Sequence, residues 1–594
     1  MATQAGTLWV PDLCMYGLFT DSITVNATQF ITISVVIGSG IYTNNGTALT
    51  IAGPMGLIVA ALVMSVVILS VNECVAELTQ QFPVYNAIVI YVRKFVDDDL
   101  GWVIGVAYWY AYATTFTSQN SMAATLLEYW GLGTTWRVLI CYVFVPIVLF
   151  LLNMTGVFWY GLVETVGGFL KLIIILSISI YLYAIADDVA SPGFEHGQGF
   201  SSDGSALCYA IPLTAYAFQG IELYAMTAFE ARDGHALRWP SRWTAYIVVA
   251  VYTMCTLGEI INVNWHDGAL PQLYDGVGNS TTSSTISHGT SHSMVIIAAL
   301  NTKNRHMAGF LNGCLLFSVF SAANTSLYVA SRTLWGIAES VPNDHWVTRQ
   351  LAILTKDTRV PVVSLLVSLL AFCWVPFLNL VHNSATSQVI QVIFTSSSNV
   401  IMIVWAALCL AFIRYYHWLK KCERELRHNN HLKFIRLSPD YTPRGSLLIL
   451  QPLQAWIGLI GCLVIFAFSS ATWWGRHATI TEVAMAYGTH IVLFVMFVIL
   501  KLRSRKKWVP LTNNWITLWK ILDGLWVRKI DHWEQSTFHR LQRVVEAILP
   551  EAWQTQNMQS DFQMTGRVPN HSDTPMPAET SSDESRTAST GPLD

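Results

Sequence analysis

Long apolar runs nearly free of charged residues restrict the possible folds of this sequence more than any other feature. Residues 59–70, 138–152, 172–184 and 245–255 contain no Asp, Glu, Lys or Arg. Charged residues make up only 12% of the 594-residue chain, against about a quarter in soluble proteins. Since a membrane-spanning helix needs about 20 mostly apolar residues, the sequence predicts a polytopic membrane protein. It excludes a soluble enzyme, a nucleic-acid-binding protein and a secreted scaffold.

Twelve apolar segments are suited to be transmembrane helices, which predicts an all-α fold. They are residues 30–50, 54–79, 101–128, 135–153, 159–185, 205–229, 242–264, 307–334, 360–380, 386–416, 447–473 and 478–502. The apolar piece Met294–Leu300 is too short to cross the bilayer, so we expect an outer-loop helix there. The transmembrane transporter domain is predicted at 29–503, after a short cytoplasmic segment at 1–28.

The distribution of Lys and Arg predicts the orientation of these spans. Cytoplasmic loops of membrane proteins carry an excess of basic residues. The loop between the tenth and eleventh spans, 414–444, contains eight of them. The loops on the opposite side contain only Arg137, Lys303, Arg305 and Arg476. With an even number of spans, both termini are expected in the cytoplasm.

The chain changes character after the last span. Apolar residues recur at spacings of three and four at Trp515, Trp519, Leu522 and Trp526. This pattern predicts amphipathic helices over 504–550, either lying on the inner leaflet or packed on the cytoplasmic loops. Residues 551–594 are rich in Ser, Thr, Pro and acidic side chains, which predicts a disordered tail.

Glycines in the first and sixth spans predict two breaks in transmembrane helices. An unwound backbone exposes N–H groups at the start of the next half-helix, where a carboxylate binds well. Its free carbonyls are suited to receive an ammonium group. Paired breaks at corresponding positions of two repeats indicate a transporter's substrate site, although small residues also serve close helix packing. The candidate substrate-binding residues are Gly38, Ser39, Gly40, Ile41, Phe218, Gly220, Ile221 and Glu222.

Lys171 is the only basic residue well inside a span, and Glu164 lies seven residues earlier on the same helical face. At about 1.5 Å rise per residue the two are roughly 10 Å apart, too far for a direct ion pair. A buried lysine binds its proton less tightly, so Lys171 is suited to load and release a proton. The alternative is a permanent structural cation bonded to carbonyls of the first span. Lys171 and Glu164 are the candidate proton-coupling residues.

Several motifs together resemble the fungal amino acid permeases of the amino acid–polyamine–organocation (APC) superfamily, over residues 28 to 500. Beyond the two breaks, they are Gly46-x-Ala48-Leu49, Tyr160-Gly161, Ser321-Ala322-x-Asn324, Tyr328-x-x-Ser331-Arg332 and Gln451-Pro452. The resemblance implies a LeuT-type fold, with a 5+5 inverted repeat and two further helices, and proton symport at the plasma membrane. Lys171 matches the proton-linked lysine of related carriers. Gln119 stands where these permeases usually have a glutamate, which makes it a candidate specificity residue.

These features predict a secondary active transporter that imports an amino acid or a related amine by proton symport and alternating access. The alternative is a non-transporting amino acid sensor of the same fold. Neither an HExxH nor a GxSxG motif occurs in the spans, so we expect no catalytic residue, no metal and no enzyme activity. The expected partners are the small-molecule substrate and the lipid bilayer, with the proton as coupling ion and no cofactor. The sequence leaves the oligomeric state open.

Overall fold

The computed structural model describes most of the predicted transmembrane region. The described residues are 34, 36–37, 40–186, 200, 204–228, 238–267, 269–270, 293–341, 345–355, 358, 360–380, 384–436, 438–443, 445, 447–468, 480–505, 507–511 and 514–526. The candidate residues Gly38 and Ser39, the segment 1–28 and the tail 551–594 lie outside them.

The described residues form helices joined by turns and contain no strand. The α-helices are α3 (Gly40–Gln81), α4 (Ala87–Phe95), α5 (Asp98–Glu128), α6 (Thr134–Val138), α7 (Val145–Met154), α8 (Val157–Ala184), α9 (Gly204–Ala215), α10 (Leu223–Thr227), α11 (Arg238–Asn262), α12 (Met294–Asn301), α13 (Arg305–Glu339), α14 (Trp346–Leu351), α15 (Val362–Phe372), α16 (Ser384–His428), α17 (Leu453–Ala467), α18 (Ile480–Ser504) and α19 (Trp515–Leu525). Short 3-10 or π turns are η2 (Leu139–Phe144), η3 (Tyr216–Phe218), η5 (Val375–Leu380), η6 (Leu432–Phe434) and η7 (Leu448–Leu450).

The helices follow the predicted spans closely but do not reproduce twelve separate ones. Seven helices of the described part are long and apolar enough to cross a membrane, and two shorter apolar helices accompany them. The first and second predicted spans join in α3, because the non-helical Gly53 (φ 75°) bends the chain without a gap. The sixth span is divided into α9, η3 and α10. The tenth continues to His428, where charged residues hide the helix from a hydropathy pattern.

Large apolar side chains on the outer faces of the helices are exposed. Phe144, Leu151, Val166 and Val492 are each more than half exposed. Exposed apolar surface on this scale is unfavourable in water and favourable against lipid chains. The described helices therefore belong to a multi-pass membrane protein.

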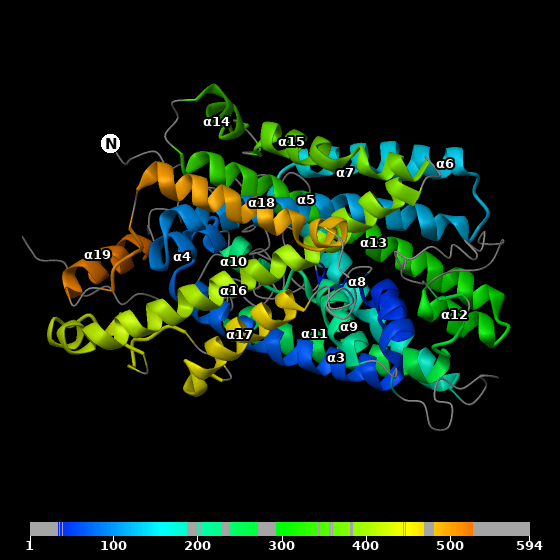
Figure 1. Ribbon diagram of the computed structural model, residues 1–594, viewed down its shortest axis with the longest axis horizontal. Coiled ribbons are helices and arrows are strands. Elements are labelled where there is room, and N and C mark those ends of the chain that lie inside the picture. The colour runs from blue at the N-terminus through cyan, green and yellow to red at the C-terminus, as the bar shows by residue number, and fades with distance from the viewer. Residues whose placement is uncertain are drawn as a thin grey trace, which may run out of the picture. The chain divides into compact units, whose positions relative to one another are not determined.

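The functional region lies inside the helix bundle, where segments far apart in the sequence pack together. Helix α13 packs along α5, α3 along α9 and α11, and α16 along α5 and α17. Helices α4 and α19 and the C-terminal part of α16 lie at one end of the bundle, while α6 and α12 lie at the other (Figure 1). We refer to these as the α19 end and the α12 end.

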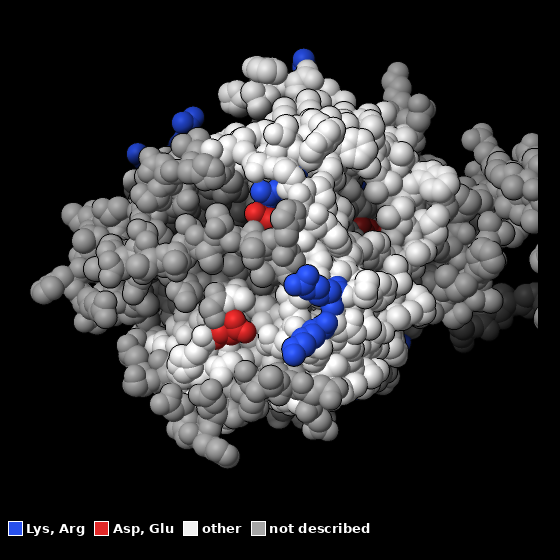
Figure 2. All heavy atoms as spheres, turned by 90° about the vertical axis from the view of Figure 1, so that its right-hand side faces the viewer, with Lys and Arg blue, Asp and Glu red and all other residues white. Residues whose placement is uncertain are grey.

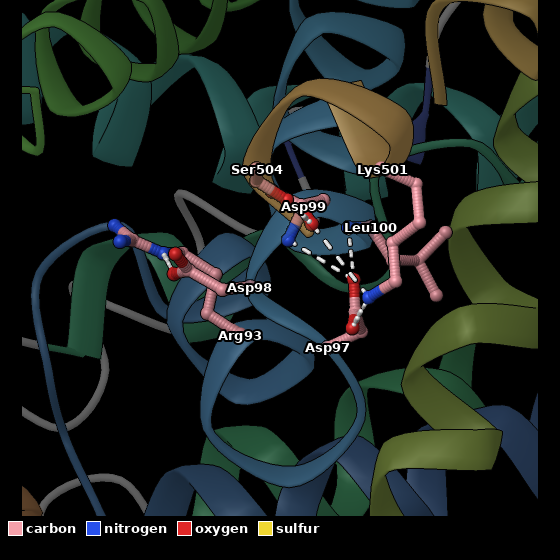
Figure 3. Close-up of polar contacts among 7 residues, drawn as sticks. All are labelled: Arg93, Asp97, Asp98, Asp99, Leu100, Lys501 and Ser504. Atoms are coloured by element: carbon pink, nitrogen blue, oxygen red, sulfur yellow. Dashed lines mark hydrogen bonds and ion pairs between the residues drawn. The ribbon is translucent and has the colours of Figure 1, made fainter. Parts of the chain in front are cut away.

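An acidic cluster at the α19 end fixes the start of α5 to the end of α18 (Figure 3). The Asp97 Oδ1 atom caps α5 by accepting hydrogen bonds from the backbone N–H groups of Asp99 and Leu100, both at 3.1 Å. Its Oδ2 atom pairs with the Lys501 ammonium group. Ser504 donates a hydrogen bond to Asp99 at 2.6 Å. One buried carboxylate thus stabilises both a helix terminus and the attachment of another helix.

Variants of Asp97 and Lys501 separate the contribution of the helix cap from that of the ion pair. Asp97→Ala removes the helix cap and the ion pair, and we expect a loss of at least about 1–2 kcal/mol, the usual contribution of an N-cap. Asp97→Asn keeps a capping oxygen and is expected to cost less. Lys501→Met removes the cation and keeps the cap. Thermal unfolding of the detergent-purified protein measures the three effects, and equal losses for Asn and Ala would contradict a capping role.

Candidate functional site

The two predicted breaks meet in space. A methyl group added at Gly40 would lie only 2.8 Å from the Ala217 Cα atom and 3.0 Å from its nitrogen, so the start of α3 touches the backbone of η3. Gly220 has φ +107°, a conformation that side chains disfavour, and it separates η3 from α10. The sixth span is therefore broken where predicted, and its break faces the start of α3.

Backbone carbonyls just before Gly40 are bonded by side chains from three other helices. Lys171 Nζ on α8 donates to the Ser34 carbonyl at 2.6 Å. Tyr252 on α11 donates to the Val36 carbonyl at 2.6 Å, and Ser318 on α13 donates to that of Ile37 at 3.1 Å. Carbonyls in an intact helix are occupied by the helix itself. Ser34 and Val36 are themselves helical and Ile37 lies in a bend. Carbonyls at the end of a helix have no partner within it, so these contacts fit a helix that ends before Gly40.

Glu164 is fully buried and accepts hydrogen bonds from two elements besides its own helix. Its donors are Ser34 Oγ at 2.5 Å, Ser321 Oγ at 3.0 Å and Asn324 Nδ2 at 2.6 Å. Among the described residues it forms no ion pair with Lys171, as the sequence spacing predicts. Ser34 nevertheless connects them, since its hydroxyl binds Glu164 and its carbonyl binds Lys171. A change in the proton on Lys171 would therefore act on the same segment of the first span that Glu164 holds.

A narrow cavity lies between the two breaks and the middle of α5 and α13. Its volume is about 20 Å³, enough for a single water molecule and too small for an amino acid. Substrate binding therefore requires the walls to separate. The lining residues are Val36, Gly40, Tyr112, Thr115, Gln119, Tyr216, Gln219, Ala322 and Ser326.

Two glutamines contribute unpaired amide oxygens to this wall. Gln119 Nε2 donates to the Tyr216 hydroxyl at 3.2 Å, and Gln219 Nε2 donates to Thr115 Oγ1 at 3.0 Å. The Oε1 atoms of both glutamines are buried and have no hydrogen-bond partner among the described residues. A buried unpaired acceptor is costly. These two oxygens are therefore available to N–H donors of a ligand.

Glu222 takes part in a buried network behind the cavity wall. Its carboxylate accepts from the Tyr112 hydroxyl at 2.7 Å and from Trp405 Nε1 at 3.0 Å. The carboxylate does not line the cavity, although Tyr112 does. Glu222 is thus placed to position Tyr112 rather than to touch a ligand in this arrangement.

The structure brings most of the predicted site residues together. Gly40 and Gln119 line the cavity; Ile41, Phe218, Gly220 and Ile221 are buried in or beside the two breaks. The sequence analysis missed Tyr112, Thr115, Tyr216 and Gln219. Tyr112, Thr115 and Gln119 are spaced by three and four residues and lie on one face of α5. That spacing is the signal that would have identified two of them.

Gly40→Ala tests the contact between the two breaks. The added methyl group would meet the backbone of Ala217, which cannot move aside as a side chain can. Overpacking of this kind costs about 1–3 kcal/mol, so we expect Gly40→Ala to lose about that much free energy of unfolding. Gly313→Ala on α13 is the matched control, because its methyl group would enter open space. Thermal unfolding of the purified protein measures both, and equal stability of the two variants would contradict the contact.

Comparison with known proteins agrees with this geometry. A lysine/arginine permease of Candida albicans is 24% identical over 79% of this chain and 78% of its own. A proline-specific permease of Emericella nidulans is also 24% identical, over 71% of this chain and 75% of its own. The solved structure of a manganese transporter from Eremococcus coleocola has a TM-score of 0.50 and 11% identity, covering 86% of this chain and 97% of that one. At that identity it shows the fold alone.

The predicted all-α LeuT-type fold is thereby confirmed, apart from the number of separate helices. The curated relatives are named as permeases, which fits a transporter and not an enzyme. The sequence model for amino acid permeases matches residues 27–513, most of the chain. This chain therefore belongs to the amino acid permease family, as the motif resemblance predicted.

Proposed function

We propose that this permease imports an amino acid across the plasma membrane by proton symport and alternating access. Membership of the family and the cavity between the two breaks support transport of an amino acid. The relatives are named as permeases, so they give the sensor alternative no support. The proton is the only coupling ion proposed, without a further cofactor.

The hydrogen bond from Lys171 to the Ser34 carbonyl carries the proton-coupling part of the proposal. The Lys171 side chain is completely buried, and its ammonium group bonds the first span at 2.6 Å. A protonated lysine attracts this carbonyl strongly, whereas a neutral amine holds it less well. Protonation thus favours one position of the first span and release favours another. That difference is what coupling between a proton and a conformational change requires.

The proposed orientation places the α19 end in the cytoplasm. Helix α19, the C-terminal part of α16 and the basic loop that follows α16 belong to this end. The α12 end is seen in Figure 2, and on α6 and around the turn from α12 to α13 its described Lys and Arg residues are Arg137, Lys303 and Arg305. The C-terminal part of α16 and the loop after it contain seven described ones: Arg414, Lys420, Lys421, Arg424, Arg427, Lys433 and Arg436. An excess of basic residues on one side favours the cytoplasm for that side. Both termini are then cytoplasmic.

The lining of the cavity favours a substrate with a neutral side chain. The described lining residues include no Asp, Glu, Lys or Arg. A cationic side chain would be buried there without a partner, which is unfavourable. The free amide oxygens of Gln119 and Gln219 are suited to the N–H groups of a neutral ligand. We assign the substrate carboxylate to the N-terminal start of α3, at Gly40 and Ile41, and the ammonium group to the break at Phe218, Gly220 and Ile221.

Gln119→Glu tests this substrate preference. The new carboxylate would lie in the cavity wall and attract a cationic side chain. A close charge pair away from water contributes about 1.5 kcal/mol or more, so the ratio of cationic to neutral uptake is expected to rise about tenfold or more. Competition between labelled neutral and cationic amino acids measures this ratio. The control Gln119→Leu, which removes the polar group without adding charge, is expected to weaken uptake of both; an unchanged ratio in Gln119→Glu would contradict the assignment.

The function itself is tested by uptake of a panel of labelled amino acids in permease-deficient yeast, with and without a proton uncoupler. Accumulation that the uncoupler abolishes supports symport and identifies the substrate. Binding without uptake, in protein that reaches the cell surface, would overturn the transport proposal in favour of sensing.

A further inference from the structure

Another buried carboxyl group, Glu259, lies on α11 beside the first span. Glu259 is completely buried, and its Oε2 atom accepts a hydrogen bond from Asn45 Nδ2 at 3.0 Å. The same amide nitrogen donates to Thr256 Oγ1 at 3.0 Å. The Glu259 Oε1 atom has no hydrogen-bond partner among the described residues. Neither the two helix breaks nor the cavity accounts for this group.

No cation neutralises Glu259 in the described part of the chain. Near Asn45, α3 presents no ionisable side chain that the structure describes, and α12 contains none. The nearest other ionisable groups on α11 are Tyr252 and Cys255, while Arg238, Arg242 and Tyr246 lie at least 13 residues before Glu259, about 20 Å or more along the helix. On α8 they are Tyr160, Glu164, Lys171, Tyr181 and Tyr183. Lys171, Tyr183 and Tyr252 are bonded to backbone carbonyls. Glu259 therefore has no salt-bridge partner among the described residues.

We propose that Glu259 is a proton-binding residue, protonated while the first span packs against it. A carboxylate buried without a counter-charge is strongly disfavoured. A proton removes that charge and requires no additional partner. A metal ion bridging the Thr256 hydroxyl and the Glu259 carboxylate would have to lie between these two oxygens. The Asn45 amide nitrogen already lies there, within hydrogen-bond distance of both. A proton therefore suits the site better than a metal cation.

Asn45 connects Glu259 to the cavity through a short helical segment. Residues 40–52 of α3 form a half-helix between the first break and the non-helical Gly53. This half-helix contributes Gly40 to the cavity wall and Asn45 to Glu259. A movement of the half-helix that opens the cavity separates Asn45 from Glu259 and admits water. The carboxyl O–H bond then breaks, the proton passes to water, and the solvated carboxylate takes up a proton again before the half-helix returns.

Infrared spectroscopy of the purified full-length protein in lipid vesicles tests the protonation directly. A protonated carboxyl group has a carbonyl stretching band distinct from that of a carboxylate. We expect Glu259→Gln to remove such a band from the spectrum. The matched control Glu128→Gln is expected to leave it, because Glu128 is partly exposed and pairs with Arg137 at 2.8 Å. An unchanged spectrum in Glu259→Gln would overturn the proposal.

Asn45→Ala provides a test that keeps the carboxyl group in place if Glu259→Gln fails to fold. Losing the Asn45 hydrogen bond is expected to shift the band to higher frequency, and an unshifted band would overturn the assignment.

The link to uptake rests on the proposed transport function. In vesicles, the half-saturation concentration of Glu259→Gln should vary less with external pH than that of the wild type; equal variation would overturn this link. Loss of the band in a protein that transports nothing would instead reject the transport proposal while supporting protonation of Glu259.

Discussion

Replacing Lys171 with Met is expected to abolish uphill accumulation of the substrate. Methionine fills a similar volume but binds no proton. The Ser34 carbonyl then loses its 2.6 Å bond to the ammonium group, and the first span no longer responds to the proton gradient. Downhill exchange of substrate is expected to persist at a reduced rate, because the cavity residues are unchanged. Uptake against a concentration gradient, measured with and without an uncoupler, checks this expectation.

Lys171→Arg separates proton coupling from the structural alternative. Arginine keeps a positive charge but does not release its proton in proteins. If Lys171 is a permanent cation that only holds the first span, Arg should preserve uphill accumulation. If Lys171 loads and releases a proton, Arg should bind substrate and fail to accumulate it. Wild-type accumulation by either variant would contradict the coupling role.

The breaks and the buried ions could be predicted from sequence because each has a local signature. Paired glycines in the middle of corresponding spans need a reason, either a break or close helix packing, and so does a lysine such as Lys171. The positions of Gly40 and Gly220 needed no knowledge of distant segments. The structure adds that Gly40 touches the backbone of Ala217, so the two breaks lie beside one another, which their pairing in sequence only suggested.

The partners of these residues could not be predicted, because they depend on packing between distant helices. Trp405 donates to Glu222 from 183 residues away in sequence. Spacing within one helix shows that Tyr112 and Gln119 share a face of α5, but not which face meets the cavity. The free oxygen of Glu259 is likewise visible only when its surroundings are known. The continuation of α16 to His428 was missed because its charged residues carry no hydropathy signal.

Breaking the buried ion pair between Glu77 and Arg436 is expected to have the largest effect on stability. Arg436 lies in the loop after α16 and binds both carboxylate oxygens of Glu77, at 2.5 and 3.0 Å. Tyr441 donates to the same carboxylate at 2.6 Å. The Glu77 side chain is only 1% exposed and that of Arg436 15% exposed. Burial alone would lower the pKa of Arg436, but the Glu77 carboxylate outweighs burial and raises it, so the guanidinium stays charged. This pair anchors the loop between α16 and α17 to α3.

Arg436→Met is therefore expected to destabilise the protein by about 3–5 kcal/mol, since it leaves the Glu77 carboxylate buried and unpaired. The double variant Glu77→Met with Arg436→Met removes both charges and should recover much of that loss, because well-packed apolar groups can replace a buried pair. The matched control Arg427→Met breaks the exposed Arg427–Glu423 pair at 3.0 Å, which contributes about 0.3–0.5 kcal/mol. Thermal unfolding of the purified variants measures all three. A double variant as unstable as Arg436→Met would show that Arg436 stabilises the loop through its other contacts, the Leu448 carbonyl at 3.1 Å and the Tyr416 ring at 4.9 Å, and not through its charge pair.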